Sequence, residues 1–286
     1  MMLEQVQSSR AELEAAITHE FRAEQRNRVR DVALAILTPV MLLAVWELTA
    51  RIGLIDGRLF SPPSRIAVRA AAMVGSGELW LHVVPTVLRL AVGFIVGALL
   101  GGLAGLLMGL WRPLRAALEP TFTALYALPK IAILPLLLLI FGLTETPRVL
   151  AVVISVFFVV QINTLAGILQ VDPGILEAAR AYKASGWKLF RFVLLPGAIP
   201  LIFTGLRVSA GMAVIVVTAV EFVASNSGLG YLIWNSWQLF QPDTMYVGLI
   251  AVSILGAVVT GLVILLERLL VPWKHSSAPL RKREKK

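Results

Sequence analysis

The chain has 286 residues, of which 58% are hydrophobic and 15% are charged, and its mean hydropathy is +0.82. This composition lies outside the range of soluble globular domains and indicates an integral membrane protein. The sequence contains no cysteine, and its three histidines, His19, His82 and His275, lie far apart along the chain. Disulfides and thiolate metal sites are therefore excluded, and a histidine metal site is not expected.

Residues 1–31 precede the first apolar stretch and form a polar tail with mixed charge. The composition of this tail suits a helix at the inner membrane surface, and a solvated tail is an equally good alternative. The first apolar run begins too late in the chain for a cleavable signal peptide. We therefore assign residues 32–273 to one membrane domain, and residues 274–286 to a basic cytoplasmic tail.

Six stretches are long and apolar enough to cross a bilayer as helices, which takes about 20 predominantly apolar residues. They lie near 32–50, 83–110, 117–141, 148–170, 199–222 and 246–270. The sequence therefore predicts an all-α membrane protein with six transmembrane helices. An even number of spans places both termini on the same side of the membrane.

The distribution of basic residues predicts which side that is, because cytoplasmic loops carry an excess of Lys and Arg. With both termini cytoplasmic, the inner segments hold most of the 26 Lys and Arg residues. The outer loops then hold only Arg51, Arg58, Arg65, Arg69 and Arg148. The net charge of +9 is thus a topology signal, and we expect no nucleic-acid partner.

The second run carries glycine at every fourth position. These residues are Gly93, Gly97, Gly101, Gly105 and Gly109. Small residues at this spacing let another membrane helix approach closely. The stripe predicts a helix-packing face; we favour static packing within one bundle, and a subunit interface or a moving joint is the alternative.

Four charged residues fall within the predicted spans or at their ends, namely Arg89, Lys130, Arg207 and Glu221. A charge near the bilayer centre costs about 2.5–3.5 kcal/mol, so it normally faces a partner or a watery path. The excess of cations would attract anions, which makes Lys130, Arg207 and Glu221 candidates for a translocation path. In the structural alternative, Arg89 and Arg207 bind helix ends or pair with Glu221 or Glu119.

The third run is the candidate pathway helix. Lys130 lies between Pro129 and Pro135, and proline removes backbone hydrogen bonds and bends a helix. The carbonyls freed by such a bend need protein or water neighbours inside a membrane.

No motif for catalysis or for nucleotide binding is present. The sequence contains no G-x-x-x-x-G-K-[ST] phosphate loop, no H-E-x-x-H and no G-x-S-x-G. We therefore expect a chain without catalytic residues, and without a cofactor or metal of its own.

Segment 177–196, EAARAYKASGWKLFRFVLLP, is a polar and basic connection between the fourth and fifth runs. It resembles the EAA loop of inner-membrane permease subunits of ATP-binding-cassette importers, whose pattern is E-A-A, three residues, Gly, nine residues, Ile-x-Leu-Pro. The residues that match this pattern are Glu177, Ala178, Ala179, Leu195 and Pro196. Segments 129–145 and 221–233 further resemble the branch that imports nitrate, taurine, alkanesulfonates and some pyrimidines.

One position departs from the pattern. Lys183 stands where the family has glycine, and Gly186 follows three residues later. Because glycine readily adopts positive φ, the departure predicts that the turn between the two short helices of the loop shifts to Gly186.

The resemblance implies a multi-pass permease of the bacterial inner (plasma) membrane with the type I importer fold. It further implies two cytoplasmic ATPase subunits that hydrolyse the ATP, a second and identical permease copy, and a periplasmic or lipid-anchored substrate-binding protein. The cytoplasmic loop, residues 171–198, would couple to the ATPases, and the solute would be a small anion such as a sulfonate, taurine or nitrate. The residues implied in coupling are Glu177, Ala178, Ala179, Lys183, Gly186, Leu195 and Pro196.

Two other functional classes compete with this interpretation. A secondary transporter driven by an ion gradient predicts inverted repeats with interrupted helices at matching positions, and Pro129 and Pro135 have no convincing counterpart in the sixth run. A structural membrane scaffold would leave Lys130, Arg207 and Glu221 without a role.

Overall fold

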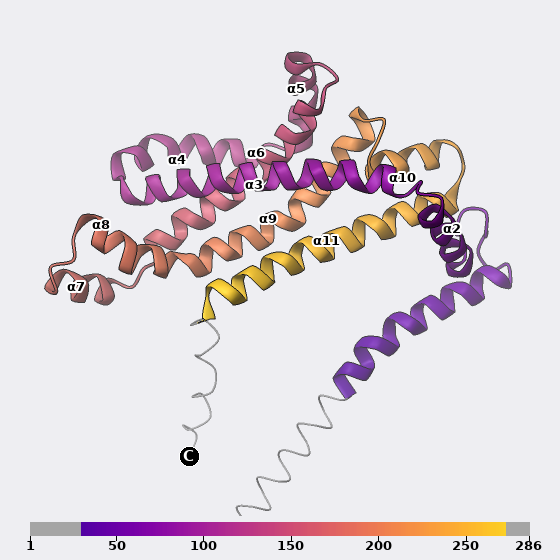
Figure 1. Cartoon of the computed structure of the whole chain (residues 1–286), viewed down its shortest axis with the longest axis horizontal. Helices are drawn as coiled ribbons and strands as arrows, with labels where there is room; N and C mark the ends of the chain where they lie inside the picture. Colours follow the sequence, from indigo (N-terminus) through magenta and orange to yellow (C-terminus); the bar gives the residue numbers. More distant parts are fainter. Residues whose placement is uncertain (1–29, 273–286) are drawn as a thin grey trace, which may run out of the picture. The chain divides into compact units, whose positions relative to one another are not determined.

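A computed structural model of the chain describes residues 30–272, and every regular element in this part is helical (Figure 1). The chain divides into two compact units, Met1–Ala67 and Val68–Lys286. The two predicted tails lie outside the described residues, apart from Arg30 and Asp31, which begin the first helix.

The described part of the first unit contains the apolar helix Arg30–Arg51, which corresponds to the first predicted run. Near its end, the Glu47 carboxylate accepts hydrogen bonds from Arg51 Nε at 2.5 Å and from Ser64 Oγ at 2.7 Å. The Ser64 backbone N–H also donates to Glu47, at 2.9 Å. Glu47 therefore ties the end of this helix to the residues that follow its connecting loop.

The remaining helices follow in chain order, and α2 crosses the boundary between the units. They are α2 (Pro63–Gly75), α3 (Trp80–Leu110), α4 (Arg112–Ala127), η1 (Lys130–Ile133), α5 (Leu134–Phe141), α6 (Glu145–Leu169), α7 (Pro173–Ala181), α8 (Gly186–Leu189), η2 (Phe190–Leu194), α9 (Leu195–Ala224), α10 (Leu229–Gln238) and α11 (Pro242–Leu270).

Helix α6 forms the centre of the second unit and packs against both α3 and α9 (Figure 1). Its valines at 152, 156 and 160 are fully buried, and they meet Val217 and Val220 of α9 in one apolar cluster. By contrast, long stretches of α3 and α11 expose leucine, valine and isoleucine. Such apolar outer faces suit helices surrounded by lipid, because a helix forms its backbone hydrogen bonds within itself and presents only apolar side chains to the lipid.

The glycine stripe of α3 faces α6 of the same chain. A Cβ atom at Gly93 would lie 2.6 Å from Val152 Cβ, and one at Gly101 would lie 2.4 Å from the Phe157 carbonyl oxygen. A Cβ atom at Gly97, Gly105 or Gly109 would likewise lie 2.6–2.8 Å from an atom of α6. The stripe is therefore the surface on which α3 and α6 approach each other within one bundle.

The third predicted run is not one straight helix. Within residues 30–272, five helices are long and apolar enough to cross a membrane, and α4 together with η1 and α5 makes a sixth span only as a pair bent by 95°. The bend lies at Leu128 and Pro129, whose ψ angles of 135° and 116° are extended. A residue before proline disfavours the helical conformation, which explains why the helix breaks there.

Close packing at the stripe generates a prediction with an internal control. Gly101→Leu should destabilise the protein by at least about 2 kcal/mol, because the new side chain collides with the α6 backbone. Gly102→Leu should change stability by less than about 0.5 kcal/mol, because a Cβ there meets nothing within 4 Å. Unfolding of both variants in detergent measures the difference, and equal stability of the two would contradict the packing role.

Candidate functional site

Helix α7 begins at a well-formed cap and carries the E-A-A residues. The Asp172 carboxylate accepts hydrogen bonds from the backbone N–H groups of Gly174 at 2.6 Å and Ile175 at 3.4 Å. Pro173 occupies the first turn, where a backbone N–H has no partner within the helix, so the N–H that proline lacks costs no hydrogen bond. Glu177 and Ala178 lie in the middle of this helix and are exposed, and Ala179 beside them is half-buried.

The turn after α7 is built on Lys183, at the position where the family pattern has glycine. Lys183 adopts φ +59°, and its N–H donates to the Arg180 carbonyl at 2.8 Å. The Ala184 N–H donates to the Ala179 carbonyl at 3.0 Å. These two bonds form a Schellman motif, whose left-handed residue is usually glycine. The turn therefore stays at the position of the family pattern, and Gly186 adds a second left-handed residue instead of replacing the first.

Gly186 adopts a second left-handed conformation, with φ +53°, where the chain enters α8. From Gly186 the chain runs as one continuous helical span of 39 residues to Ala224, through α8, η2 and α9. Leu195 and Pro196 lie at the start of α9, where proline is tolerated in the first turn. The connection therefore enters the span without a break.

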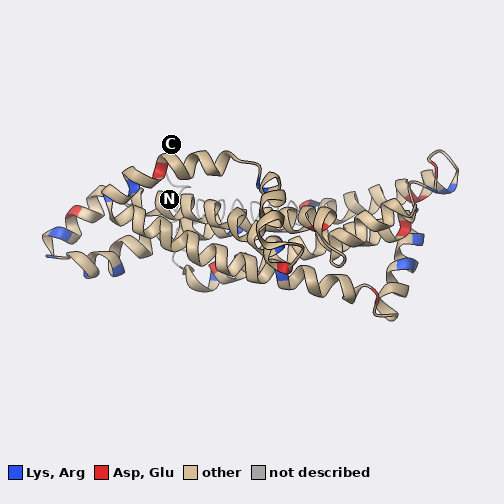
Figure 2. Ribbon diagram, turned by 90° about the horizontal axis from the view of Figure 1, so that it is seen from above, with Lys and Arg blue, Asp and Glu red and all other residues tan. Residues whose placement is uncertain are grey.

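The loop formed by α7, the Lys183 turn and α8 exposes aromatic and basic side chains. Tyr182 is 90% exposed and Trp187 is 67% exposed. Lys and Arg residues lie at this end of the unit (Figure 2). The basic residues of the loop are Arg180, Lys183, Lys188 and Arg191, all of them exposed.

Lys130 lies directly after the break between α4 and α5 and is half-buried. Its ammonium donates to the Tyr126 carbonyl, which the broken helix leaves without its usual partner. The ammonium also lies 4.5 Å from the centre of the Tyr126 ring and 5.7 Å from that of Phe158. Among residues 30–272, no carboxylate forms an ion pair with Lys130.

Arg207 pairs with the buried carboxylate of Glu267 on α11, which the sequence analysis did not single out. The alternative pairing of Arg207 with Glu221 or Glu119 is therefore wrong. Glu221 lies 14 positions further along the same helix, about 21 Å away at 1.5 Å per residue. The contact between α9 and α11 decides the partner instead.

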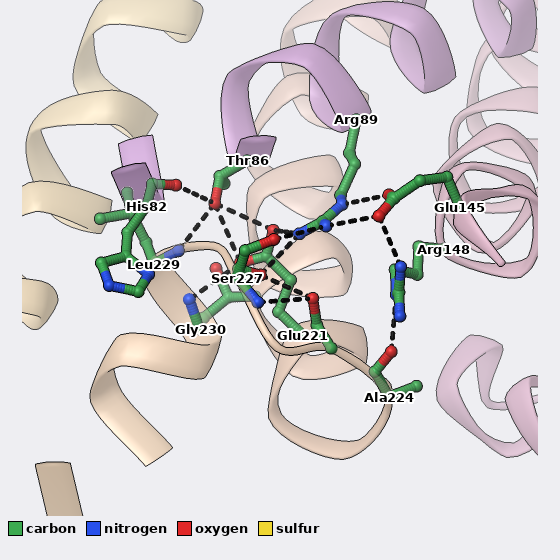
Figure 3. A network of polar contacts seen from close by, with 12 residues as sticks. His82, Thr86, Arg89, Glu145, Arg148, Glu221, Ala224, Ser227, Leu229 and Gly230 are labelled. Carbon is green, nitrogen blue, oxygen red and sulfur yellow. Dashed lines mark hydrogen bonds and ion pairs between the residues drawn. The ribbon is translucent and has the colours of Figure 1, made fainter. Parts of the chain in front are cut away.

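Arg89, Glu145, Arg148 and Glu221 form a network at the opposite end of the unit from the α7–α8 loop (Figure 3). Arg89 binds Glu145 through Nε at 2.6 Å and Nη2 at 2.8 Å, and it binds Glu221 through Nη1 at 2.8 Å. Arg148 donates to Glu145 at 2.5 Å and to the Ala224 carbonyl at 2.6 Å. Two cations and two carboxylates are thus joined across α3, α6 and α9.

The chain between α9 and α10 folds around the Glu221 carboxylate. Thr86 Oγ1 and the Gly230 N–H both donate to this carboxylate, and Thr86 Oγ1 accepts from the Leu229 N–H at 2.8 Å. A Cβ atom at Gly228, whose φ is +113°, would lie 2.3 Å from the Glu221 carboxyl carbon. Glu221 is fully buried and fully partnered, and glycine is required where the loop crosses it.

Sequence reasoning missed Glu145, Arg148 and Glu267 as partners of the intramembrane charges. The predicted start of the fourth run, residue 148, is three residues too late, because α6 begins at Glu145. The spacing of Glu145 and Arg148, three residues apart, is a signal that could have revealed their pairing on one helix face. The described residues contain no group of His, Cys, Asp or Glu that could hold a metal.

Comparisons with known proteins agree with this architecture. Residues 93–274 match the family described as "Binding-protein-dependent transport system inner membrane component". A putative aliphatic sulfonates transport permease protein of Escherichia coli is 37% identical, over 82% of this chain and 89% of the relative. A taurine transport system permease protein of the same species is 30% identical, over 85% and 90%. A riboflavin transport system permease protein of Chloroflexus aurantiacus is 36% identical, over 89% and 96%.

Solved structures support the same fold. A chain of the MetNI methionine ABC transporter, in an inward-facing conformation, superposes with a TM-score of 0.56 at 21% sequence identity. That match covers 68% of this chain and 97% of the transporter chain. An amino acid ABC transporter chain superposes with a TM-score of 0.54 at 22% identity. The chain therefore belongs to the family of binding-protein-dependent transport system inner membrane components, as a multi-pass permease subunit of an ATP-binding-cassette importer.

Proposed function

We propose that this permease carries a small anionic solute, of the sulfonate or taurine kind, past Lys130. The observation that carries this proposal is that, of the three cations singled out within the predicted spans, Arg89 and Arg207 pair with glutamates, whereas Lys130 has no carboxylate partner among residues 30–272. Arg89, Arg148 and Arg207 are each neutralised by a glutamate of the same chain. An unpaired ammonium at membrane depth is stabilised when an anion passes beside it.

The relatives alone do not select the solute. Two of them are named as permeases for sulfonates and taurine, and a third is named for riboflavin at a similar identity. The charge of Lys130 favours the anionic class. Tyr126 and Phe158 beside it offer an apolar wall that suits an organic anion with a short carbon chain.

For energy coupling, the exposed α7–α8 loop would dock on a cytoplasmic ATPase. Its basic side chains favour an acidic groove on that partner, and the exposed aromatic residues Tyr182 and Trp187 would provide buried contacts there. The continuous helix from Gly186 to Ala224 supports this role, because movement of the loop passes directly into the span.

The remaining partners are a second copy of the permease and an outer substrate-binding protein. A second copy would cover the apolar surface of α5 and of the short connection after it, where Leu139 is 82% exposed and Leu143 is 79% exposed. ATP would be bound and hydrolysed by the ATPase subunits. No observation on this chain favours transport driven by an ion gradient.

The path proposal predicts different outcomes for two cations. Lys130→Met should lower uptake of an anionic solute by the reconstituted importer about tenfold or more, because the countercharge is lost in a weakly screened site. Arg207→Met should instead lower the melting temperature, because the ion pair with the buried Glu267 is lost, and uptake per folded molecule should stay near normal. Unchanged normalised uptake for Lys130→Met would remove Lys130 from the path.

The docking proposal predicts that Glu177→Lys abolishes binding of the cytoplasmic ATPase while the permease stays folded in the membrane. The exposed side chain makes no contact that the fold needs, so the charge reversal should act on the partner alone. Co-purification of the ATPase with the variant measures the effect. Retention of the ATPase at wild-type strength would exclude Glu177 from coupling.

The Lys183 turn predicts opposite effects of two substitutions. Lys183→Gly removes left-handed strain of about 1–2 kcal/mol and should slow hydrogen exchange at the Ala184 amide by about fivefold. Gly186→Val introduces such strain and should speed exchange across α8 and reduce uptake. Hydrogen–deuterium exchange of the solubilised permease measures the effect of each substitution on the loop. Faster exchange at the Ala184 amide in Lys183→Gly would contradict the turn assignment.

A further inference from the structure

The network at the end of the unit opposite the α7–α8 loop has one exposed member. The side chains of Arg89 and Arg148 are 4% and 6% exposed, and both converge on the Glu145 carboxylate, which is 60% exposed. Glu221, the other carboxylate, is fully buried. Two buried cations thus share one exposed anion.

A pocket of about 310 Å³ lies beside this anion. Its polar lining comes from Arg89, Glu145 and Ser227, and the rest of the lining is apolar. The apolar lining residues are Pro85, Leu88, Val92 and Val149. The pocket therefore combines a charged end with hydrocarbon walls, which is the arrangement that a small amphiphilic anion requires.

The charges of the network explain why an anion is needed at this position. Glu221 neutralises one of the two buried guanidinium groups from the inner side. Without Glu145, one buried positive charge would remain uncompensated next to the pocket. Glu145 is also the first residue of the 25-residue helix α6, whose N-terminus favours a negative charge.

The Glu145 carboxylate can leave without unpacking the interior. Its contacts are all made by the two guanidinium groups, which point toward it from the bundle (Figure 3). The inner contacts of Arg89 with Glu221 and Ser227, and that of Arg148 with the Ala224 carbonyl, do not involve Glu145. Arg89 lines the pocket, so a second anion of similar size can take its donors from that side, and it meets Arg148 only where it replaces the Glu145 carboxylate.

We propose that the Glu145 carboxylate occupies an anion-binding site, and that the sulfonate group of a short alkanesulfonate replaces this carboxylate there. The sulfonate oxygens would accept from Arg89 and Arg148, and the alkyl chain would lie against Leu88 and Val92. This inference rests on the proposed import of anions. It adds a binding site in the permease itself, distinct from Lys130 and closed by the chain's own carboxylate when no solute is present.

Chemical rescue of a truncated side chain tests the site. In the purified full-length permease, Glu145→Ala should lower the melting temperature by about 5–10 °C, because it leaves a buried charge unpaired. Butanesulfonate should restore at least half of this loss in a saturable manner. Dimethyl sulfone, which is uncharged, and sodium chloride at matched ionic strength should restore none of it. The wild type should bind butanesulfonate at least tenfold more weakly, because Glu145 competes.

Two further variants keep the test decisive. Glu78→Ala removes a carboxylate paired with Arg69 outside the network, so butanesulfonate should not stabilise this variant. Glu145→Gln retains the shape of the side chain and serves if Glu145→Ala does not fold. The proposal is overturned if neither Glu145 variant is saturably stabilised, or if Glu78→Ala is stabilised equally. Sulfonate uptake by the wild-type importer is measured in parallel. Uptake without saturable stabilisation would contradict the Glu145 site alone, whereas absence of uptake would contradict the proposed function.

Discussion

The salt bridges of Arg89 are the interactions on which the arrangement of one end of the bundle depends. One guanidinium group joins α3 to the start of α6 through Glu145, to α9 through Glu221 and to the following loop through Ser227. Breaking a buried ion pair of this kind costs about 3–5 kcal/mol, since the remaining charge has no water to replace its partner. Four chain segments are therefore held in one relative position by a single side chain.

Helix α9 connects this end of the bundle to the opposite one. The continuous helical span from Gly186 to Ala224 has 39 residues, and at 1.5 Å per residue it is about 58 Å long. The exposed loop precedes this span, the pair of Arg207 with Glu267 lies along it, and Glu221 lies near its far end. A displacement of the loop would thus act on the residues that hold the α9–α10 connection, without a flexible joint between them.

Pairing divides the intramembrane charges into two groups. Arg89, Arg148 and Arg207 are neutralised within the chain. For Arg207, whose glutamate is buried, this suits a structural role in a medium that does not screen charge. Lys130 differs because the break at Pro129 places it beside the Tyr126 carbonyl, to which it donates, and two aromatic rings, and it forms no ion pair with a described carboxylate. Chain geometry, more than the type of residue, therefore separates a candidate transport residue from structural ones.

The sequence by itself determined the membrane class, the positions of the apolar runs, the packing role of the glycine stripe and the family pattern of the α7–α8 loop. These features follow from local composition and spacing, because lipid imposes an apolar length on every span and small residues are needed at close helix contacts. The position of the Lys183 turn could also have been read from the family pattern, yet the residue type argued against it, since a left-handed conformation is unfavourable for lysine.

Only the tertiary structure decided which charges meet. Arg207 and Glu267 are 60 positions apart, and Arg89 and Glu221 are 132 positions apart, so their pairing depends on how whole helices pack. The fold of the α9–α10 connection is likewise set by residues distant in sequence, because Thr86 binds the Leu229 N–H and Arg89 binds the Ser227 carbonyl. Local sequence patterns determine whether a segment can cross a membrane as a helix. Contacts between helices determine which buried charges are neutralised and which are available to bind a solute, because the partners of Arg89 and Arg207 lie on other helices.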